Sequence, residues 1–172
     1  MSQAASASDQ GPALLALYDS ALPQVYGYLV RRCDGATVAE DLTAETFLAA
    51  VAAVQKGSVP SLTTAWLIGV ARHKLVDHWR RQARDQRNLR AVADEPTEDP
   101  DPWDAHLDAS LAHDVLGRLG AHHRSALTLR YLDGLSVPDV ADHLGRTLHA
   151  TEALLVRARL AFRRAYEGTD DG

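Results

Sequence analysis

Residues 134–164, near the end of the chain, have the pattern of two helices joined by a tight turn. Ser136 can cap the first helix, and Asp139 places a carboxylate in its opening turn, where the helix dipole favours negative charge. Gly145 can adopt the left-handed conformation that ends a helix, and the apolar spacing resumes after two further residues. The pattern predicts a helix-turn-helix, whose second helix enters the major groove of DNA. A helical hairpin that only fills a core has the same pattern and is the alternative.

The spacing of apolar residues predicts which faces of these two helices are buried. In the first helix the expected buried residues are Val137, Val140, Ala141 and Leu144. In the second they are Leu148, Thr151, Leu155, Ala158 and Phe162. The opposite face of the second helix is mostly polar and carries His149, Glu152, Ala153, Val156, Arg157 and Arg163. This face is the candidate for contact with DNA.

Two residues of that face are candidates for reading bases. Arg157 could donate two hydrogen bonds to guanine O6 and N7, although a solvated or phosphate-bound arginine is the alternative. Glu152 could accept from cytosine N4, or it could mainly repel phosphates. Phosphate contacts that position the helix are expected from other arginines, namely Arg146, Arg159 and Arg163.

Composition limits the class of protein. The chain has 172 residues with a net charge of −5, and no apolar run approaches the ~20 residues that cross a bilayer. The single cysteine, Cys33, excludes an intramolecular disulfide and a cysteine-rich zinc site. Residues 1–11 lack the basic and apolar regions of a signal peptide and are expected to form a disordered tail. A cytoplasmic location without membrane insertion follows as an expectation.

The charges are unevenly distributed. Residues 72–90 hold seven basic side chains against two carboxylates, and residues 146–164 hold five arginines against one glutamate. Between them, residues 94–108 carry seven acidic side chains, three prolines and no Lys or Arg. Such a segment cannot bury enough apolar surface to fold alone, so it is interpreted as an acidic flexible linker.

The remaining periodicity is helical throughout. Three helices are expected before the linker, at 12–32, 37–56 and from 62 to beyond 81, with Pro23 a kink or restart in the first. The first helix is predicted to bury Leu15, Tyr18, Leu22, Val25 and Leu29. Helices at 107–119 and 121–132 precede the helix-turn-helix. The predicted fold is all-α, with two small helical domains joined by the linker and a four-helix C-terminal domain.

The third helix combines an apolar stripe with a basic end. Arg80, Arg84 and Arg87 form a ladder suited to a DNA backbone. Trp66 and Trp79 could stack on unpaired bases, but tryptophans in the apolar part of a helix are more often core anchors. His73 lies on the side of this helix away from the apolar stripe, and it is the better candidate for contact with a melted strand.

An enzyme is the rival class. The chain has eight histidines, but His73 and His78 point in different directions, and the adjacent His122 and His123 cannot easily bind one metal. No metal-binding, phosphate-cradling or nucleophile motif is present. Catalysis, a metal and a cofactor are therefore not expected.

Three segments together resemble the extracytoplasmic-function (ECF) sigma factors of bacterial RNA polymerase. Residues 39–51 (AEDLTAETFLAAV) resemble the family's polymerase-binding helix, and residues 64–81 (TAWLIGVARHKLVDHWRR) its promoter-melting helix. The segments LRYLDGLSVPDVADHLG and TEALLVRARLAFRR resemble its C-terminal DNA-reading domain. The resemblance implies a sigma factor that binds core RNA polymerase and directs it to a promoter, with an anti-sigma factor as a further partner.

The resemblance implies a role for each part. Residues 12–90 would form sigma domain 2, residues 91–106 the linker in the polymerase channels, residues 107–167 sigma domain 4, and residues 168–172 a tail. The minus-35 contacts would be Arg146, Thr147, His149, Glu152, Ala153, Val156, Arg157, Arg159 and Arg163. The minus-10 contacts would be Lys56, Ser58, Ser61, Thr63, His73, Lys74, Arg80, Arg81, Arg84 and Arg87. His73 stands where many members have Asn.

The second helix would dock on the polymerase through Asp41, Glu45 and Leu48. Without the resemblance, these residues would be a solvated helix face and the linker would be a spacer. The rival function is a stand-alone helix-turn-helix regulator with an N-terminal sensing domain, which would have no use for a basic melting helix.

Overall fold

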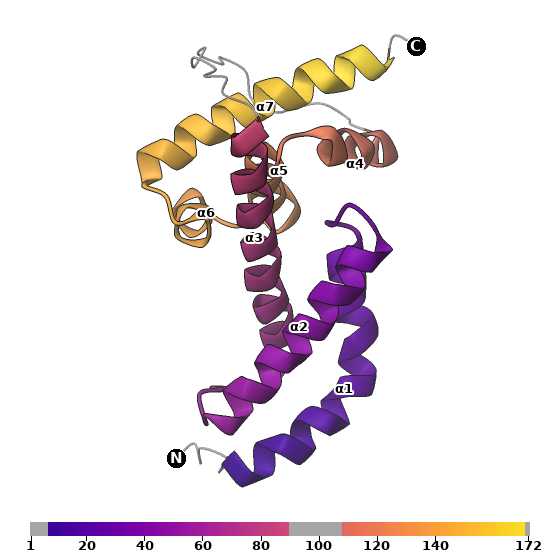
Figure 1. Ribbon diagram of the computed structural model, residues 1–172, viewed down its shortest axis with the longest axis vertical. Helices are drawn as coiled ribbons and strands as arrows, with labels where there is room; N and C mark the ends of the chain where they lie inside the picture. Colours follow the sequence, from indigo (N-terminus) through magenta and orange to yellow (C-terminus); the bar gives the residue numbers. More distant parts are fainter. Residues whose placement is uncertain (1–6, 90–107, 171–172) are drawn as a thin grey trace. The chain divides into compact units, whose positions relative to one another are not determined.

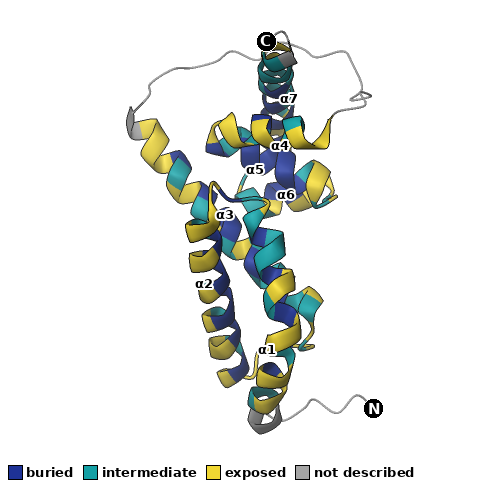
Figure 2. Ribbon diagram, turned by 90° about the vertical axis from the view of Figure 1, so that its right-hand side faces the viewer, coloured by how far each residue is buried: buried dark blue, intermediate teal, exposed yellow. Residues whose placement is uncertain are grey.

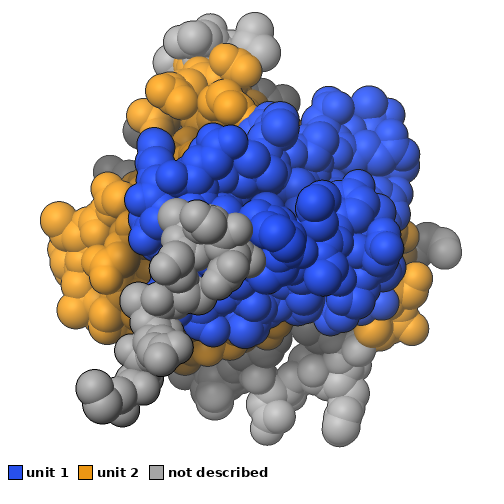
Figure 3. Space-filling view, turned by 90° about the horizontal axis from the view of Figure 1, so that it is seen from below, with its two compact units in different colours: residues 1–75 blue, residues 76–172 orange. Residues whose placement is uncertain are grey.

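A computed structural model describes residues 7–89 and 108–170. These residues form helices joined by short loops, and no strand occurs among them, so the predicted all-α fold is confirmed (Figure 1). The predicted linker lies outside the described residues. The chain divides into two compact units, residues 1–75 (unit 1) and 76–172 (unit 2), which are coloured separately in Figure 3. The boundary falls inside one helix, α3, and each unit is described by itself.

Unit 1 is built from α1 (Ala7–Val30), α2 (Ala36–Gln55) and the first half of α3 (Thr64–Leu89). Helices α1 and α2 lie side by side, and their facing surfaces are buried (Figure 2). Thr43 and Thr46 can be buried in α2 because their hydroxyls donate to the carbonyls of Ala39 and Leu42, both at 2.7 Å. The buried α2 residues include Leu42, Thr46 and Ala50.

The first helix differs from its prediction in register and extent. Leu15 is 76% exposed, and Leu14 is buried in its place with Ala21, Val25 and Leu29. Tyr18 is also exposed, although its ring packs edge-on against Phe47, with centroids 4.8 Å apart. The helix begins at Ala7 rather than residue 12, and it continues through Pro23 without a restart. A proline there removes one backbone donor, which the packed helix tolerates.

Unit 2 contains the second half of α3, then α4 (Ala109–Arg118), α5 (Ala121–Leu127), a π-helical turn η1 (Thr128–Leu132), α6 (Val137–Leu144) and α7 (Leu148–Asp170). Helix α7 packs against α4, α5 and α6. One buried cluster joins Val115, Leu127, Ala158 and Phe162, and another joins Ala126, Leu154 and Leu155. The core therefore forms along one side of α7.

Most of the burial predicted in unit 2 is confirmed. Val140, Ala141, Thr151, Leu155, Ala158 and Phe162 are buried. Leu148 was predicted to be buried and is 48% exposed, because it begins α7 before the helix meets the core; Leu154 is buried instead. Helix α7 also continues to Asp170, past the expected start of a tail. Trp79 is only 2% exposed, which confirms its interpretation as a core anchor, while Trp66 is half-buried.

Candidate nucleic-acid interface

The turn between α6 and α7 is fixed by local hydrogen bonds. The Ser136 hydroxyl accepts from the Asp139 amide at 3.2 Å and donates to the Asp139 carboxylate at 2.6 Å. Gly145 ends α6 with φ of 61°, in the left-handed region that favours glycine. Thr147 begins α7 by accepting from the Ala150 amide at 3.2 Å. These interactions join residues that are close in the sequence, and they set where α6 begins and ends and where α7 begins.

The first turns of α7 have one buried and one accessible face. His149 and Glu152 are exposed, and Ala153 and Val156 are half-buried, whereas Thr151 on the other side is completely buried. Helix α7 therefore presents the predicted mixed face of polar and small side chains. A face of this kind can approach base edges because small side chains such as Ala153 lie between the polar ones.

Three arginines of α7 are partly enclosed by the fold. Arg157 and Arg163 are half-buried, and the Nε of Arg157 has no hydrogen-bond partner among the described residues. The guanidinium of Arg159 donates to the hydroxyl of Tyr131 at 3.3 Å, which ties α7 to η1. Arg159 is thus held by the fold.

The loop between α2 and α3 carries four of the predicted minus-10 residues. Gly57 has φ of 65°, and the Ser58 hydroxyl donates to the Ala53 carbonyl at 3.1 Å. Thr63 caps α3 by accepting from the Trp66 amide at 3.1 Å. Lys56 and Ser61 are exposed. In α3 itself His73 is exposed and Lys74 is half-buried.

The two compact units divide the predicted minus-10 set. Unit 1 holds Lys56, Ser58, Ser61, Thr63, His73 and Lys74. Unit 2 holds Arg80, Arg81, Arg84 and Arg87, whose side chains are all exposed.

The second half of α3 caps two other helices of unit 2. The Gln86 side chain accepts from the Ala121 amide at 3.1 Å, at the N-terminus of α5. The Arg80 guanidinium donates to the His143 carbonyl in the last turn of α6. An acceptor at a helix start and a cation at a helix end both match the helix dipole. Arg80, one of the predicted minus-10 residues, therefore also caps a helix of unit 2.

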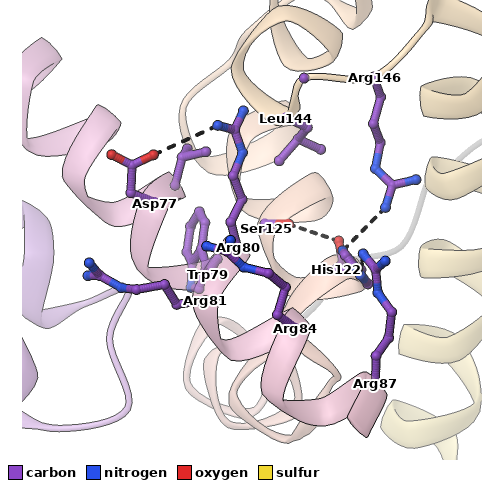
Figure 4. Close-up of a pocket in the computed structure, with 12 residues that line it drawn as sticks. Asp77, Trp79, Arg80, Arg81, Arg84, Arg87, His122, Ser125, Leu144 and Arg146 are labelled. Carbon is purple, nitrogen blue, oxygen red and sulfur yellow. Dashed lines mark hydrogen bonds and ion pairs between the residues drawn. The ribbon is translucent and has the colours of Figure 1, made fainter.

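Figure 4 shows Arg87 of α3 and Arg146 of the α6–α7 turn directed at one histidine, His122. Arg87 Nη2 lies 3.1 Å from Nε2 of His122, and Arg146 Nη2 lies 3.4 Å from its Nδ1. Burial, then the charges of Arg146 and Arg87, lower the pKa of His122 from 6.5 to about 4. Burial also lowers the pKa of Arg146. His122 is thus neutral at pH 7.

Sequence reasoning missed the role of His122. The adjacent histidines at 122 and 123 suggest only a metal pair, and no local pattern connects residue 122 with residues 87 and 146. Among residues 7–89 and 108–170, no group of three or more His, Cys, Asp and Glu side chains could hold a metal ion.

One face of α2 carries the predicted polymerase-binding residues. Asp41 is exposed, Glu45 is half-buried and Leu48 is 69% exposed. Val51, one turn further on, is also exposed. The face therefore offers carboxylates beside apolar side chains.

None of the described helices is long and apolar enough to cross a membrane.

Unit 2 contains a helix-turn-helix with capped ends, and the basic helix α3 runs from unit 1 into unit 2. Together these features define a DNA-binding transcription protein. Comparison with known proteins gives the family. Residues 17–85 match the family model of Sigma-70 region 2, and residues 110–162 match that of Sigma-70, region 4. The chain belongs to the ECF sigma factors of RNA polymerase, as the two relatives described next also indicate.

The ECF RNA polymerase sigma factor BldN of Streptomyces coelicolor is 33% identical over 148 residues, covering 83% of this chain and 56% of that protein. The ECF RNA polymerase sigma factor SigL of Mycobacterium tuberculosis is 33% identical over 144 residues, covering 81% of each chain. The fold is similar to that of the sigma factor RpoE of Bartonella quintana, solved in complex with the anti-sigma factor NepR. That similarity has a TM-score of 0.54 at 22% identity and covers 87% of this chain and 94% of that one.

Proposed function

We propose that this protein binds core RNA polymerase and directs promoter-specific transcription initiation, by recognising the minus-35 element and melting the minus-10 element. The observation that carries the proposal is the accessible face of α7. The opposite side of α7 is buried, and the capped helix α6 precedes it in the helix-turn-helix. Family membership supplies core RNA polymerase as a partner of the chain. Sigma factors regulate transcription through DNA recognition, and we propose no enzymatic activity for this chain.

Minus-35 recognition is assigned to the first turns of α7. His149, Glu152, Ala153 and Val156 supply the accessible surface, with Thr147 at the start of the helix. Arg157 contributes the guanidinium that can fork onto guanine. Arg146, Arg159 and Arg163 position the helix on phosphates.

Minus-10 opening is assigned to the α2–α3 loop and to α3. The loop hydroxyls of Ser58, Ser61 and Thr63 can offer hydrogen bonds to an extruded base. His73 is accessible to a separated strand, while Arg81 and Arg84 neutralise phosphates.

Polymerase binding is assigned to Asp41, Glu45 and Leu48 of α2. Carboxylates around an exposed leucine fit a groove that is apolar at its centre and basic at its edge. The domain assignment stays as predicted, with domain 2 at 12–90 and domain 4 at 107–167. The family matches at 17–85 and 110–162 support it.

Residues 91–106 are proposed to enter the polymerase channels in place of nucleic acid. A variant with Asp99, Asp101 and Asp104 changed to Asn should bind core polymerase normally and initiate poorly in abortive and run-off assays. Normal initiation would make the segment a spacer. We also propose a cytoplasmic location and an anti-sigma partner, the latter because the RpoE structure of similar fold is a complex with one.

Run-off transcription with purified core polymerase tests the main proposal. Transcripts should require both core and this protein, and should start at a defined promoter. A gel shift with the protein alone gives the necessary contrast. A stand-alone regulator would bind its site tightly without polymerase and would not program core, whereas the proposed sigma factor should bind weakly until it joins core.

A further inference from the structure

Unit 2 contains a cavity of about 780 Å³ whose wall is rich in arginine (Figure 4). Its lining includes Arg80, Arg81, Arg84, Arg87 and Arg146, and all of the lining residues belong to unit 2. Asp77 is the one carboxylate among them, and it pairs with Arg80 at 3.8 Å. A volume of this size lies within the range of small-molecule sites.

The positive charge of this cavity is poorly compensated. Within the described part of the chain, neither Arg81 nor Arg84 has an ion-pair partner. Arg87 and Arg146 each direct a guanidinium nitrogen at a different ring nitrogen of His122. A neutral imidazole has only one acceptor nitrogen, so it can accept from only one of the two guanidinium groups. At least one guanidinium donor therefore lacks an acceptor.

Arg146 and His122 are half-buried, so guanidinium donors at this end of the cavity are partly removed from water, which is unfavourable unless an anion joins them. The low pKa of His122, about 4, agrees with this geometry, since burial and then Arg146, Arg87, His123 and Arg157 all disfavour its protonation. The cluster thus gathers cations around a group that stays neutral.

We propose that this cavity binds a short chain of phosphate groups, such as tripolyphosphate or the polyphosphate tail of a nucleotide. Guanidinium groups bind phosphate oxygens through two parallel hydrogen bonds. Arg80, Arg84 and Arg87 follow one helix face at intervals of about one turn, roughly 5–6 Å between neighbouring side-chain origins, which suits several linked phosphates better than one. Arg146 faces them from the α6–α7 turn.

At the end of the cavity formed by Arg87 and Arg146, the geometry favours a small anion over a DNA duplex. Arg87 and Arg146 both direct their guanidinium groups at His122, as Figure 4 shows. Trp79 and Leu144 also line the cavity, so its wall has an apolar part as well as the arginines. The inference goes beyond the proposed function, and it is tested without polymerase or promoter.

The experiment is isothermal titration calorimetry of the full chain at pH about 8, where His122 is neutral. Tripolyphosphate, ATP without metal, sulfate and a glutamate-rich peptide are compared at matched ionic strength. We expect tripolyphosphate to bind with one-to-one stoichiometry and at least about tenfold more tightly than sulfate or the peptide. ATP distinguishes the two sources of the phosphate chain, because tighter binding of ATP than of tripolyphosphate would identify a nucleotide as the ligand.

Variants locate the site. Arg87→Gln and Arg146→Gln should each weaken tripolyphosphate binding by about tenfold, because each removes one guanidinium. Arg164→Gln is the matched control, since Arg164 is exposed on α7 and does not line the cavity. Arg80 is left intact because it caps α6, and thermal melting verifies that each variant is folded.

NMR of His122 gives a readout that is independent of affinity. A bound phosphate chain would offset Arg146, Arg87, His123 and Arg157, so the pKa of His122 should rise from about 4 toward 6.5. The proposal is overturned if tripolyphosphate binds no more tightly than sulfate or the acidic peptide. It is also overturned if the two cavity variants lose no more affinity than Arg164→Gln.

Discussion

The guanidinium of Arg80 donates to the backbone carbonyl of His143, so a residue of α3 completes the C-terminus of α6. A Cβ at Gly145 would lie 3.2 Å from Nη2 of Arg80. Gly145 thus serves two purposes, because it adopts a left-handed conformation and leaves space for the guanidinium. The turn before the proposed recognition helix is therefore coupled to the basic end of α3.

Gly145→Ala should destabilise the protein. A side chain at φ of 61° is strained by about 1 kcal/mol, and the new Cβ would also press on Arg80. We expect a loss of ~1–2 kcal/mol in the free energy of unfolding, measured by urea denaturation. Gly168→Ala is the control, because Gly168 lies in α7 with open space around it and should gain helix propensity. Equal effects of the two substitutions would contradict the coupling.

Stability should fall in mild acid because of His122. Its pKa is about 4 in the folded chain and 6.5 ordinarily, so between these values the unfolded chain binds more protons and the free energy of unfolding decreases as pH falls. We expect a contribution of ~1–2 kcal/mol after allowing for solvent screening of a half-exposed ring.

Urea denaturation at pH about 7.5 and about 5 measures this contribution. His122→Gln should reduce the difference between the two conditions, and His149→Gln, which alters an exposed histidine, should leave it unchanged. If both variants kept the wild-type pH dependence, His122 would not be the group responsible.

Reversing the charge of the α2 face should weaken polymerase binding. Asp41→Lys combined with Glu45→Lys replaces attraction to a basic groove with repulsion, so co-purification with core should fall at least about tenfold. Helicity should be retained, because surface substitutions usually change stability by about 0.5 kcal/mol or less. Asp19→Lys combined with Asp114→Lys is the control, with the same change in net charge at other exposed positions. Unchanged recovery of core with the α2 variant would remove this face from the proposal.

The two basic segments should fail in different ways. Arg157→Ala should lower affinity by ~1–3 kcal/mol and relax preference at one minus-35 position, because a base contact is lost. Arg81→Ala combined with Arg84→Ala should weaken binding to every sequence and make its salt dependence shallower, because phosphate neutralisation is lost.

Holoenzyme binding and permanganate footprinting on duplex and pre-melted templates separate these effects. An open minus-10 bubble should reduce the defect of the Arg81 and Arg84 double variant, since strand separation is already complete, but should leave that of Arg157→Ala. Rescue of Arg157→Ala by the bubble would contradict the separation of reading from melting.

Local features of the fold could be predicted from the sequence because they depend on neighbours in the chain. Ser136, Gly145 and the spacing of Val140, Ala141, Leu155 and Phe162 fix the bounds and buried faces of α6 and α7 within a few residues. The exposure of Leu48 followed from helical periodicity in the same way. The error at Leu15 arose because neighbouring leucines gave two possible registers, which only packing against α2 distinguishes.

The association of distant residues could not be predicted. Periodicity placed Arg80, Arg84 and Arg87 on one exposed face, but it carries no information on what that face meets. Only the tertiary structure brings Arg80 to the end of α6, Gln86 to the start of α5, and Arg87 and Arg146 to His122. The sequence by itself determined the helices, their caps and their amphipathic faces, because these arise from interactions a few residues apart. The arginine-lined cavity depends on side-chain contacts across 24 to 63 positions of the chain, which the packing of the helices alone decides.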